Sequence, residues 1–373
     1  MRKNYASIDI MRGVAILMVI VVHMQQVIVG TTRISWYAQY GQMGVQLFFV
    51  ASAFTLCNSY DGPLGAPHKK AKFWLRRYFR IAPGYYTGIL LYFIASCVFG
   101  YHSGAYTARN VVANVFFVNG LYPPANNNIV PGGWSIGTEM LFYVLFPALF
   151  RGYSRIRHTI VYYLVPVVSL AANYLVVLVL SGIMPSIPDS LVAYLAVNNN
   201  SFSYYSVLAQ LPVFLVGMSL YHLHRSGHFE AIHSSVLVVG FAFLTSCGFY
   251  AFFHHGLIWR PFLLIPFLTA TGMASLFLVL ERFHVAWPPL RRVGLLSYSG
   301  YLVSSFFIFV VAARLSPEFH LFQGNIGLLV ALVLFTLIIL VCADVLHRTV
   351  ENNGIKLGRL VISKLDEQAK PTI

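Results

Sequence analysis

Ionisable side chains within two apolar stretches of the chain are the first candidates for chemistry. Arg12 and His23 lie in the first apolar stretch, and Glu139 lies in a later one that opens at Trp134. An ionisable group inside a membrane span costs about 2.5–3.5 kcal/mol on insertion scales, so it usually faces a cavity or a partner. Because a carboxylate can fix the tautomer of a neighbouring imidazole, these residues predict general acid/base chemistry.

The spacing of Arg12 and His23 places both side chains on one face of a helix. Eleven residues end about 20° past three full turns and rise about 16 Å along the axis. Trp134 suits the outer interface of a membrane, and Glu139 would then lie about 7 Å further in, at roughly the depth of His23. A structural alternative stays open, in which Arg12 pairs with Asp9 and the other two side chains make buried hydrogen bonds.

Two further arginines, Arg77 and Arg80, stand at the start of the third apolar stretch with Arg-x-x-Arg spacing. Guanidinium groups bind phosphates through two parallel hydrogen bonds, so this spacing is suited to a phosphorylated ligand. The alternative is ordinary anchoring of a membrane protein by basic residues on its cytoplasmic side. The two readings predict different partners for the same side chains.

The composition of the 373 residues excludes most soluble classes. Apolar residues make up 58% of the chain and charged residues only 10%, whereas an ordinary soluble chain carries roughly 25% charged residues. So few charges cannot cover the surface of a cytosolic enzyme, a disordered chain or a secreted disulfide scaffold. We therefore expect an all-α, polytopic membrane helix bundle. The four cysteines lie far apart and nothing has metal-ligand spacing, so no metal is expected.

Ten segments approach the length of about 20 apolar residues that a membrane span needs. Twenty of the 25 Lys and Arg residues fall on one side of these segments and four on the other, which by the positive-inside rule places both termini in the cytoplasm. This distribution accounts for the net charge of +14 without a nucleic-acid partner. We expect residues 1–373 to form a single integral-membrane domain. The predicted spans are 8–29, 41–58, 82–101, 134–150, 159–182, 204–221, 234–253, 261–280, 294–313 and 324–346.

Groups of residues in order along nearly the whole chain resemble the acyltransferase-3 family of integral-membrane O-acyltransferases. Arg12 and His23 have the family's Arg-x10-His spacing. The chain departs from the family pattern at Ala53, where Gly is usual, and at Ser304, near a position where His is common, so we assign no catalytic role to the ninth span. The other matching segments are 44–54, 77–83, 134–143, 294–302 and 350–351.

The resemblance implies transfer of an acyl group, most often acetyl, from cytoplasmic acyl-coenzyme A (acetyl-CoA or another acyl-CoA) to a sugar hydroxyl of an envelope or exported polysaccharide. His23, Glu139 and Arg12 would form the catalytic group, with His23 as general base and Glu139 orienting it. Arg77 and Arg80, joined by Arg12, would hold the donor phosphates. No metal is involved in this chemistry.

The resemblance also implies the setting in which the protein works. The expected partners are the lipid bilayer, the acyl-CoA donor, a glycan or lipid-linked sugar acceptor, and polysaccharide-assembly proteins. The expected location is a bacterial-type inner membrane. Because the chain ends soon after its last predicted span, we expect the stand-alone form of the family, without a fused esterase-like domain.

Two other classes of function remain open from the sequence. A proton-coupled secondary transporter of a small metabolite or glycan precursor would also bury His, Glu and Arg side chains among ten spans. Against it, the two halves show no repeat, and a carrier gives no reason for the Arg-x-x-Arg spacing at one mouth. A non-catalytic membrane partner in a glycan-assembly complex would tolerate replacement of Arg12 and His23.

Overall fold

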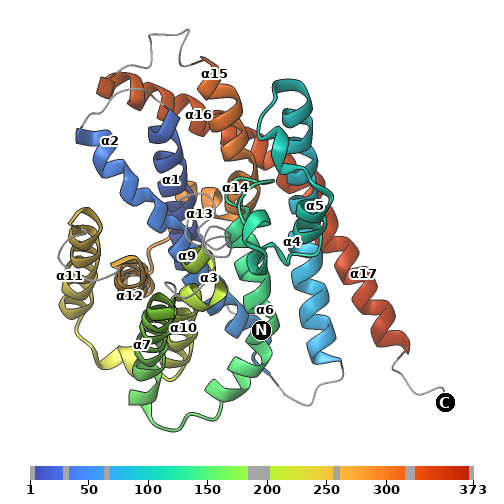
Figure 1. The fold of residues 1–373 in the computed structure, drawn as a ribbon. Helices are drawn as coiled ribbons and strands as arrows, with labels where there is room; N and C mark the ends of the chain where they lie inside the picture. The colour runs from blue at the N-terminus through green and yellow to red at the C-terminus, as the bar shows by residue number, and fades with distance from the viewer. Residues whose placement is uncertain are drawn as a thin grey trace.

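The computed structural model describes residues 5–27, 33–62, 68–183, 202–254, 261–315 and 324–368. Within these ranges every regular element is a helix and no strand occurs, which confirms the prediction of an all-α fold. The longer helices cross one another at different angles, with α12 seen end-on beside the upright α11, and short elements connect them (Figure 1).

Nine helices of the described part are long and apolar enough to cross a membrane, and a bent pair makes up to ten. The long helices are α1 (Ala6–Val27), α3 (Gly44–Tyr60), α4 (Lys69–Phe99), α6 (Gly133–Tyr153), α7 (Thr159–Ile183), α10 (Val207–Arg225), α11 (Ser234–Phe253), α12 (Pro261–Arg282) and α16 (Gly324–Leu346). The bent pair is α13 (Pro288–Leu295) and α14 (Ser297–Ser305), the latter continued by the π-helical η7 (Phe306–Ala312). The chain is therefore an integral, multi-pass membrane protein. The cytoplasmic placement of its termini stays a prediction.

Shorter elements join these helices at both ends of the bundle. They are α2 (Arg33–Ala38), η1 (Gln39–Met43), η2 (Ser103–Ala105), α5 (Ala108–Val115), η3 (Asn119–Leu121), η4 (Pro123–Ala125), α9 (Phe202–Tyr205), η6 (His228–Ala231), α15 (Ala313–Leu315), the π-helical η9 (His347–Glu351) and α17 (Asn352–Gln368). The segment between α4 and α6 contains α5 and three short turns of helix. Its packing against the start of α6 leaves Asn114 and Asn119 fully buried.

Helix α4 begins well before the predicted span. The apolar stretch opens near residue 82, but the helix starts at Lys69, because Lys, Arg, Ala and Leu favour helix whatever their polarity. Arg77 and Arg80 consequently lie on a rigid helix rather than in a loop. The helix fixes their direction as well as their position.

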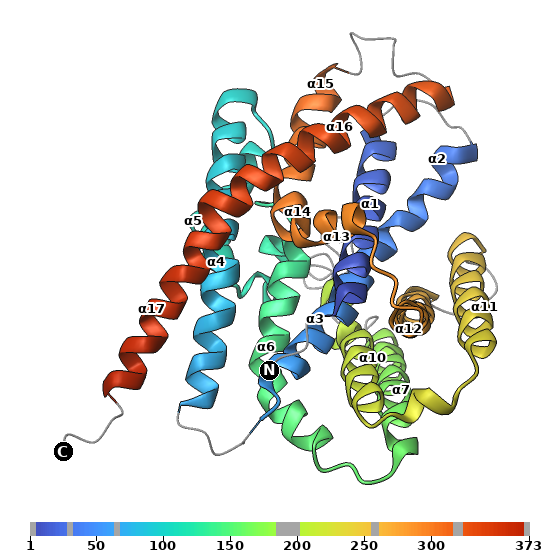
Figure 2. The ribbon, with the colours of Figure 1, turned by 180° about the vertical axis from the view of Figure 1, so that it is seen from behind.

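The ninth predicted span, 294–313, is broken rather than continuous. Helices α13 and α14 meet at an angle of 66°. At the break, a Cβ added to Gly294 would lie 1.7 Å from the carbonyl oxygen of Asp9, so the backbones of α13 and α1 touch there. The bend turns α14 into the interior of the bundle (Figure 2).

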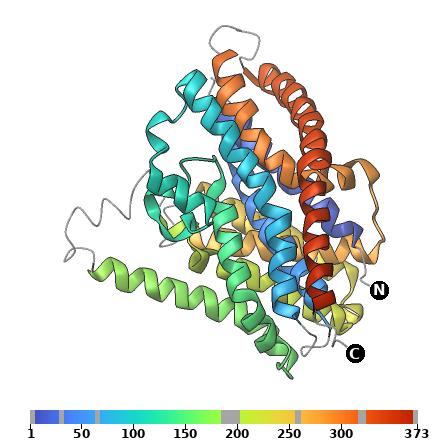
Figure 3. The ribbon, with the colours of Figure 1, turned by 90° about the vertical axis from the view of Figure 1, so that its right-hand side faces the viewer.

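The tenth predicted span ends at 346, but the helix continues through η9 into α17. Figure 2 shows this long helix running diagonally from α16 at the upper right to α17 at the lower left. Helix α17 packs against the first half of α4, where Gly358 faces the ring of Phe79 and Lys72 pairs with Asp366 (Figure 3). Hydropathy marks the part of the helix that suits a bilayer and misses the polar, amphipathic part that follows.

The core of the bundle lies around α1, α3, α6 and α10. The Phe214 ring of α10 stacks between Phe49 of α3, with ring centroids 4.4 Å apart, and Phe142 of α6, at 4.0 Å. All three rings are buried. This stack holds α3 against α6, and both helices contribute residues to the central pocket.

Candidate active site

Helices α1, α3, α4, α6 and α14 surround a pocket of about 80 Å³ in the middle of the bundle. Four of the five residues predicted from the sequence line it: Arg12, Arg77, Arg80 and Glu139. The remaining lining residues are Val45, Phe48, Phe49, Ser52, Thr55, Ile81, Ser135, Ile136, Tyr143, Ser297, Tyr298 and Tyr301. Residues that are widely separated in sequence thus meet at one site.

Arg12 reaches the pocket from the first half of α1. The alternative partner, Asp9, is instead engaged by α13: its Oδ2 lies 3.1 Å from Nε of Arg291. Within the described part of the chain, Arg12 makes neither a hydrogen bond nor an ion pair. Its guanidinium is therefore available to a ligand in the pocket.

Arg77 and Arg80 enter the pocket from the first half of α4. Arg77 donates a hydrogen bond to the Ser59 hydroxyl at 3.1 Å, while its buried Nε has no partner among the described residues. With Arg12, three guanidinium groups face a single carboxylate, that of Glu139. The excess of positive charge suits an anionic ligand, and planar guanidinium groups suit phosphate in particular.

Glu139 projects from the second turn of α6. Its Oε1 accepts a hydrogen bond from the Ser52 hydroxyl of α3 and another from the Tyr143 hydroxyl at 2.6 Å. Tyr143 is one turn further along the same helix. The carboxylate is thus held in one orientation by two hydroxyl groups from two helices.

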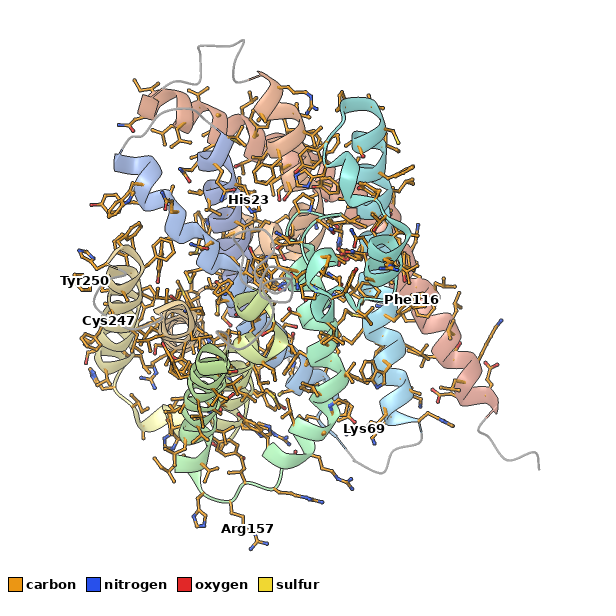
Figure 4. The ribbon with its side chains drawn as sticks, in the orientation of Figure 1. His23, Lys69, Phe116, Arg157, Cys247 and Tyr250 are labelled. Atoms are coloured by element: carbon orange, nitrogen blue, oxygen red, sulfur yellow. The ribbon has the colours of Figure 1, made fainter. Side chains whose placement is uncertain are left out.

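His23 does not line this pocket. It lies about 16 Å from Arg12 along α1, in the upper half of that helix in Figure 4. Its ring centroid is 5.1 Å from that of Phe309, and its buried Nδ1 has no hydrogen-bond partner among the described residues. The sequence placed His23 and Glu139 at similar depths in the membrane, but the two side chains do not pair. Glu139 instead accepts hydrogen bonds from Ser52 and Tyr143.

One wall of the pocket lies beside the middle of α1, between Arg12 and His23. Gly44, at the start of α3, packs against Ala15 and Met18 of α1, so the neighbouring Val45 lines the pocket beside the middle of α1. His23 lies further along α1 in the same direction. The structure therefore places the arginines and Glu139 together at the pocket, with His23 on the same helix as Arg12 but outside the lining.

Helix α14 forms one wall of the pocket and is held from three sides. The Tyr298 hydroxyl donates to the carbonyl of Ile81 at 2.6 Å, and the Tyr301 hydroxyl donates to the carbonyl of Gly132 at 2.9 Å. Ser299 donates to Oε2 of buried Glu351 at 3.0 Å, and Nδ1 of His347 lies 2.9 Å from the same oxygen. These contacts fix the position of α14 in the wall of the pocket.

Ser52, Tyr143, Tyr298 and Tyr301 were not predicted as site residues. All four fall within the segments by which the sequence resembles the acyltransferase-3 family, and that is the signal that could have found them. A hydroxyl in an apolar segment is too common for composition alone to single it out. Only the packing of α3, α6 and α14 shows that these hydroxyls face one pocket.

A charged cluster around Asp61, which lies just past the candidate span that ends at Tyr60, closes the C-terminal end of α3. Asp61 pairs with Arg225 and accepts a hydrogen bond from the Tyr221 hydroxyl at 2.8 Å. Burial alone would raise the pKa of Asp61, but the hydrogen bonds from Tyr221 and Arg225 outweigh it, so the pKa lies below its ordinary value. This cluster fastens α3 to α10 below the pocket.

A bundle of apolar helices around an arginine-lined pocket defines a polytopic membrane protein. A family model described as an acyltransferase domain matches residues 5–347, and the chain belongs to this family, acyltransferase-3. Over 164 residues the chain is 28% identical to the peptidoglycan O-acetyltransferase OatA of Listeria monocytogenes. That match covers 39% of this chain and 24% of the relative, so the chain aligns with about a quarter of it. No solved structure matches the chain significantly.

Proposed function

We propose that this protein is a membrane O-acyltransferase that moves an acetyl group from cytoplasmic acetyl-CoA to a hydroxyl of an envelope or exported polysaccharide in a bacterial inner membrane. Membership of the acyltransferase-3 family supports acyl transfer, and the similarity to a peptidoglycan O-acetyltransferase supports acetyl and a glycan acceptor. The observation that carries the proposal is the pocket in which Arg12, Arg77 and Arg80 meet Glu139.

The arginines are assigned to the donor. Acyl-CoA is a polyanion whose phosphates are separated from its thioester by a long, thin pantetheine arm. Arg77 and Arg80 lie on the first half of α4, the side that the charge pattern predicts to be cytoplasmic, and both line the pocket. Guanidinium groups bind phosphates through paired hydrogen bonds, which supports this assignment. The arm would then extend through the pocket past Arg12 toward the outer half of the bundle.

His23 is assigned to the acceptor. It shares a face of α1 with Arg12, and its buried Nδ1 has no hydrogen-bond partner among the described residues. An imidazole changes protonation near neutral pH, so it can take the proton of an incoming sugar hydroxyl. Glu139 is assigned to the reaction inside the pocket, where Ser52 and Tyr143 hold its carboxylate. A thioester is activated enough that positioning and a base are a sufficient catalyst.

The test is transfer of labelled acetyl from acetyl-CoA into alkali-labile glycan in membranes that contain the native glycan. Wild-type membranes should incorporate label, and membranes with His23→Ala at equal protein level should not. His158→Ala, an exposed histidine between α6 and α7, is the matched control and should retain incorporation. No incorporation by wild type would contradict the proposal and return attention to a transporter.

A further inference from the structure

The hydroxyl of Ser52 behaves unlike the other hydroxyls of its helix. Thr55 bonds back to the carbonyls of Ala51 and Ser52, and Ser59 bonds back to the carbonyl of Leu56. Such bonds to the preceding turn are the usual way in which a helix satisfies Ser and Thr. Ser52 instead donates across to Glu139 of α6.

Small neighbours on α3 make this contact possible. Ala51 and Ala53 flank Ser52 and are fully buried, so α3 approaches its neighbours closely. A few residues before them, Phe49 stacks on Phe214, which in turn stacks on Phe142 of α6. The packing of α3 against α6 therefore sets the distance from the Ser52 hydroxyl to the carboxylate.

The arrangement has the parts of an activated nucleophile. A hydroxyl within hydrogen-bond reach of a base, with the base oriented by a third group, is the general signature of nucleophilic catalysis. Here Ser52 is the hydroxyl, Glu139 the base and Tyr143 the orienting group. Arg12 lines the same pocket without a partner among the described residues and can stabilise negative charge on a carbonyl oxygen.

We propose that Ser52 is acylated by the donor and carries the acyl group during the reaction, with Glu139 as its base. The inference rests on the acyltransferase activity proposed above and specifies its route. In the first step the Ser52 oxygen attacks the thioester carbon and its proton passes to Glu139. The carbon–sulfur bond breaks, coenzyme A leaves as thiolate and is protonated by solvent, and Ser52 holds an oxygen ester.

The second step transfers the ester to the acceptor. A sugar hydroxyl that enters the pocket attacks the ester carbon, and its proton passes by way of water to His23, which lies on α1 outside the pocket lining. The ester bond to Ser52 breaks, and the Ser52 oxygen recovers a proton from Glu139. His23 then releases its proton to the solvent, which replaces the proton taken up by the coenzyme A thiolate. The sum of both steps is one acyl group moved from sulfur to sugar oxygen, with no net change in the protein.

The experiment is acid-quenched labelling of the purified full-length protein in lipid nanodiscs with acetyl-labelled acetyl-CoA and no glycan. We expect about one acetyl per chain, released by alkali and mapped to Ser52, together with one equivalent of free coenzyme A released in a burst. Ser52→Ala should remove both the label and the burst, and should lower glycan acetylation at least about 10³-fold. The matched control, Ser246→Ala on the exposed side of α11, should label like the wild type.

His23→Ala separates the two steps. It should accept label on Ser52 and keep it when glycan is added, whereas wild-type protein should lose the label to glycan. A wild-type preparation that acetylates glycan but never retains label would overturn the inference and leave the proposed function standing. Label on another residue, or glycan acetylation by Ser52→Ala at the wild-type rate, would also overturn it. A preparation that neither retains label nor acetylates glycan would overturn both proposals.

Discussion

Replacement of Arg80 by Ala tests the assignment of the arginines to the donor phosphates. Arg80 lines the pocket from α4 beside Arg12 and Arg77, with no acidic side chain but Glu139 among the lining residues. A hydrogen bond to a charged partner contributes about 1.5–3 kcal/mol, which is roughly 10- to 150-fold in affinity. Removal of Arg80 also relieves repulsion among three like charges. We therefore expect the lower part of this range, about a 10- to 30-fold rise in the KM for acetyl-CoA.

The assay compares two donors. Acetyl-CoA carries the phosphates, whereas S-acetylpantetheine presents the same thioester and arm without the nucleotide. Wild-type protein should have a higher kcat/KM with acetyl-CoA than with S-acetylpantetheine. In Arg80→Ala the ratio of these two kcat/KM values should fall by about the same factor by which the KM for acetyl-CoA rises. The rate of Arg80→Ala with S-acetylpantetheine should stay close to that of wild type. If the fall in the kcat/KM ratio equals the rise in KM, the Arg80 side chain interacts with the nucleotide part of the donor.

Arg76→Ala is the matched control, because Arg76 precedes the same stretch of α4 and carries the same charge but does not line the pocket. It should leave the preference for acetyl-CoA largely intact. If Arg80→Ala kept the wild-type KM for acetyl-CoA, or slowed both donors equally, the assignment of Arg80 to a phosphate would be refuted. A role in folding alone would lower the amount of protein without changing the ratio of the two donors.

Three further predictions concern different parts of the account. Tyr143→Phe removes one of the two hydrogen bonds to Glu139, and we expect kcat to fall about 10- to 100-fold with little change in the KM for acetyl-CoA. Gly294→Ala places a methyl group into the backbone of α1 and should lower the free energy of unfolding by about 1–3 kcal/mol or more, seen as a lower Tm in detergent; an unchanged Tm would contradict the close packing. The lowered pKa of Asp61 stabilises the fold above about pH 4 and this contribution is lost as pH falls through the folded pKa. Asp61→Asn, which breaks the pair with half-exposed Arg225, should therefore cost about 1 kcal/mol or less at neutral pH and flatten the acid side of the stability curve.

Hydropathy was sufficient to predict the class of fold, because a bilayer imposes long apolar segments that composition reports directly. Hydropathy did not predict the ends of helices that continue beyond their apolar segment. Helix α4 starts at Lys69 and α17 ends at Gln368, both far outside the apolar stretches, since polar residues with good helix propensity extend a helix without extending its hydrophobic part. The bend between α13 and α14 also escaped prediction, because it depends on the contact of Gly294 with α1.

Helix periodicity and family resemblance found most of the site. They selected Arg12, Arg77, Arg80 and Glu139, and the structure brings these four together. The sequence did not reveal the hydrogen-bond partners of Glu139. The depth of a residue along its own helix does not determine which side chains a neighbouring helix turns toward it. Those partners are the hydroxyl groups of Ser52 and Tyr143, which only the packing of α3 on α6 reveals. The same limit applies to Asp9, whose partner Arg291 is remote in sequence.

The most direct test of the account replaces Glu139 by Gln and measures incorporation of labelled acetyl from acetyl-CoA into alkali-labile glycan. The substitution keeps the shape of the side chain and an oxygen that can accept the hydrogen bonds of Ser52 and Tyr143, but it removes the base from the pocket. At equal protein level, we expect incorporation by Glu139→Gln to fall to background while wild type continues to label the glycan. Incorporation by Glu139→Gln at the wild-type rate would contradict the assignment of this pocket as the place of acyl transfer.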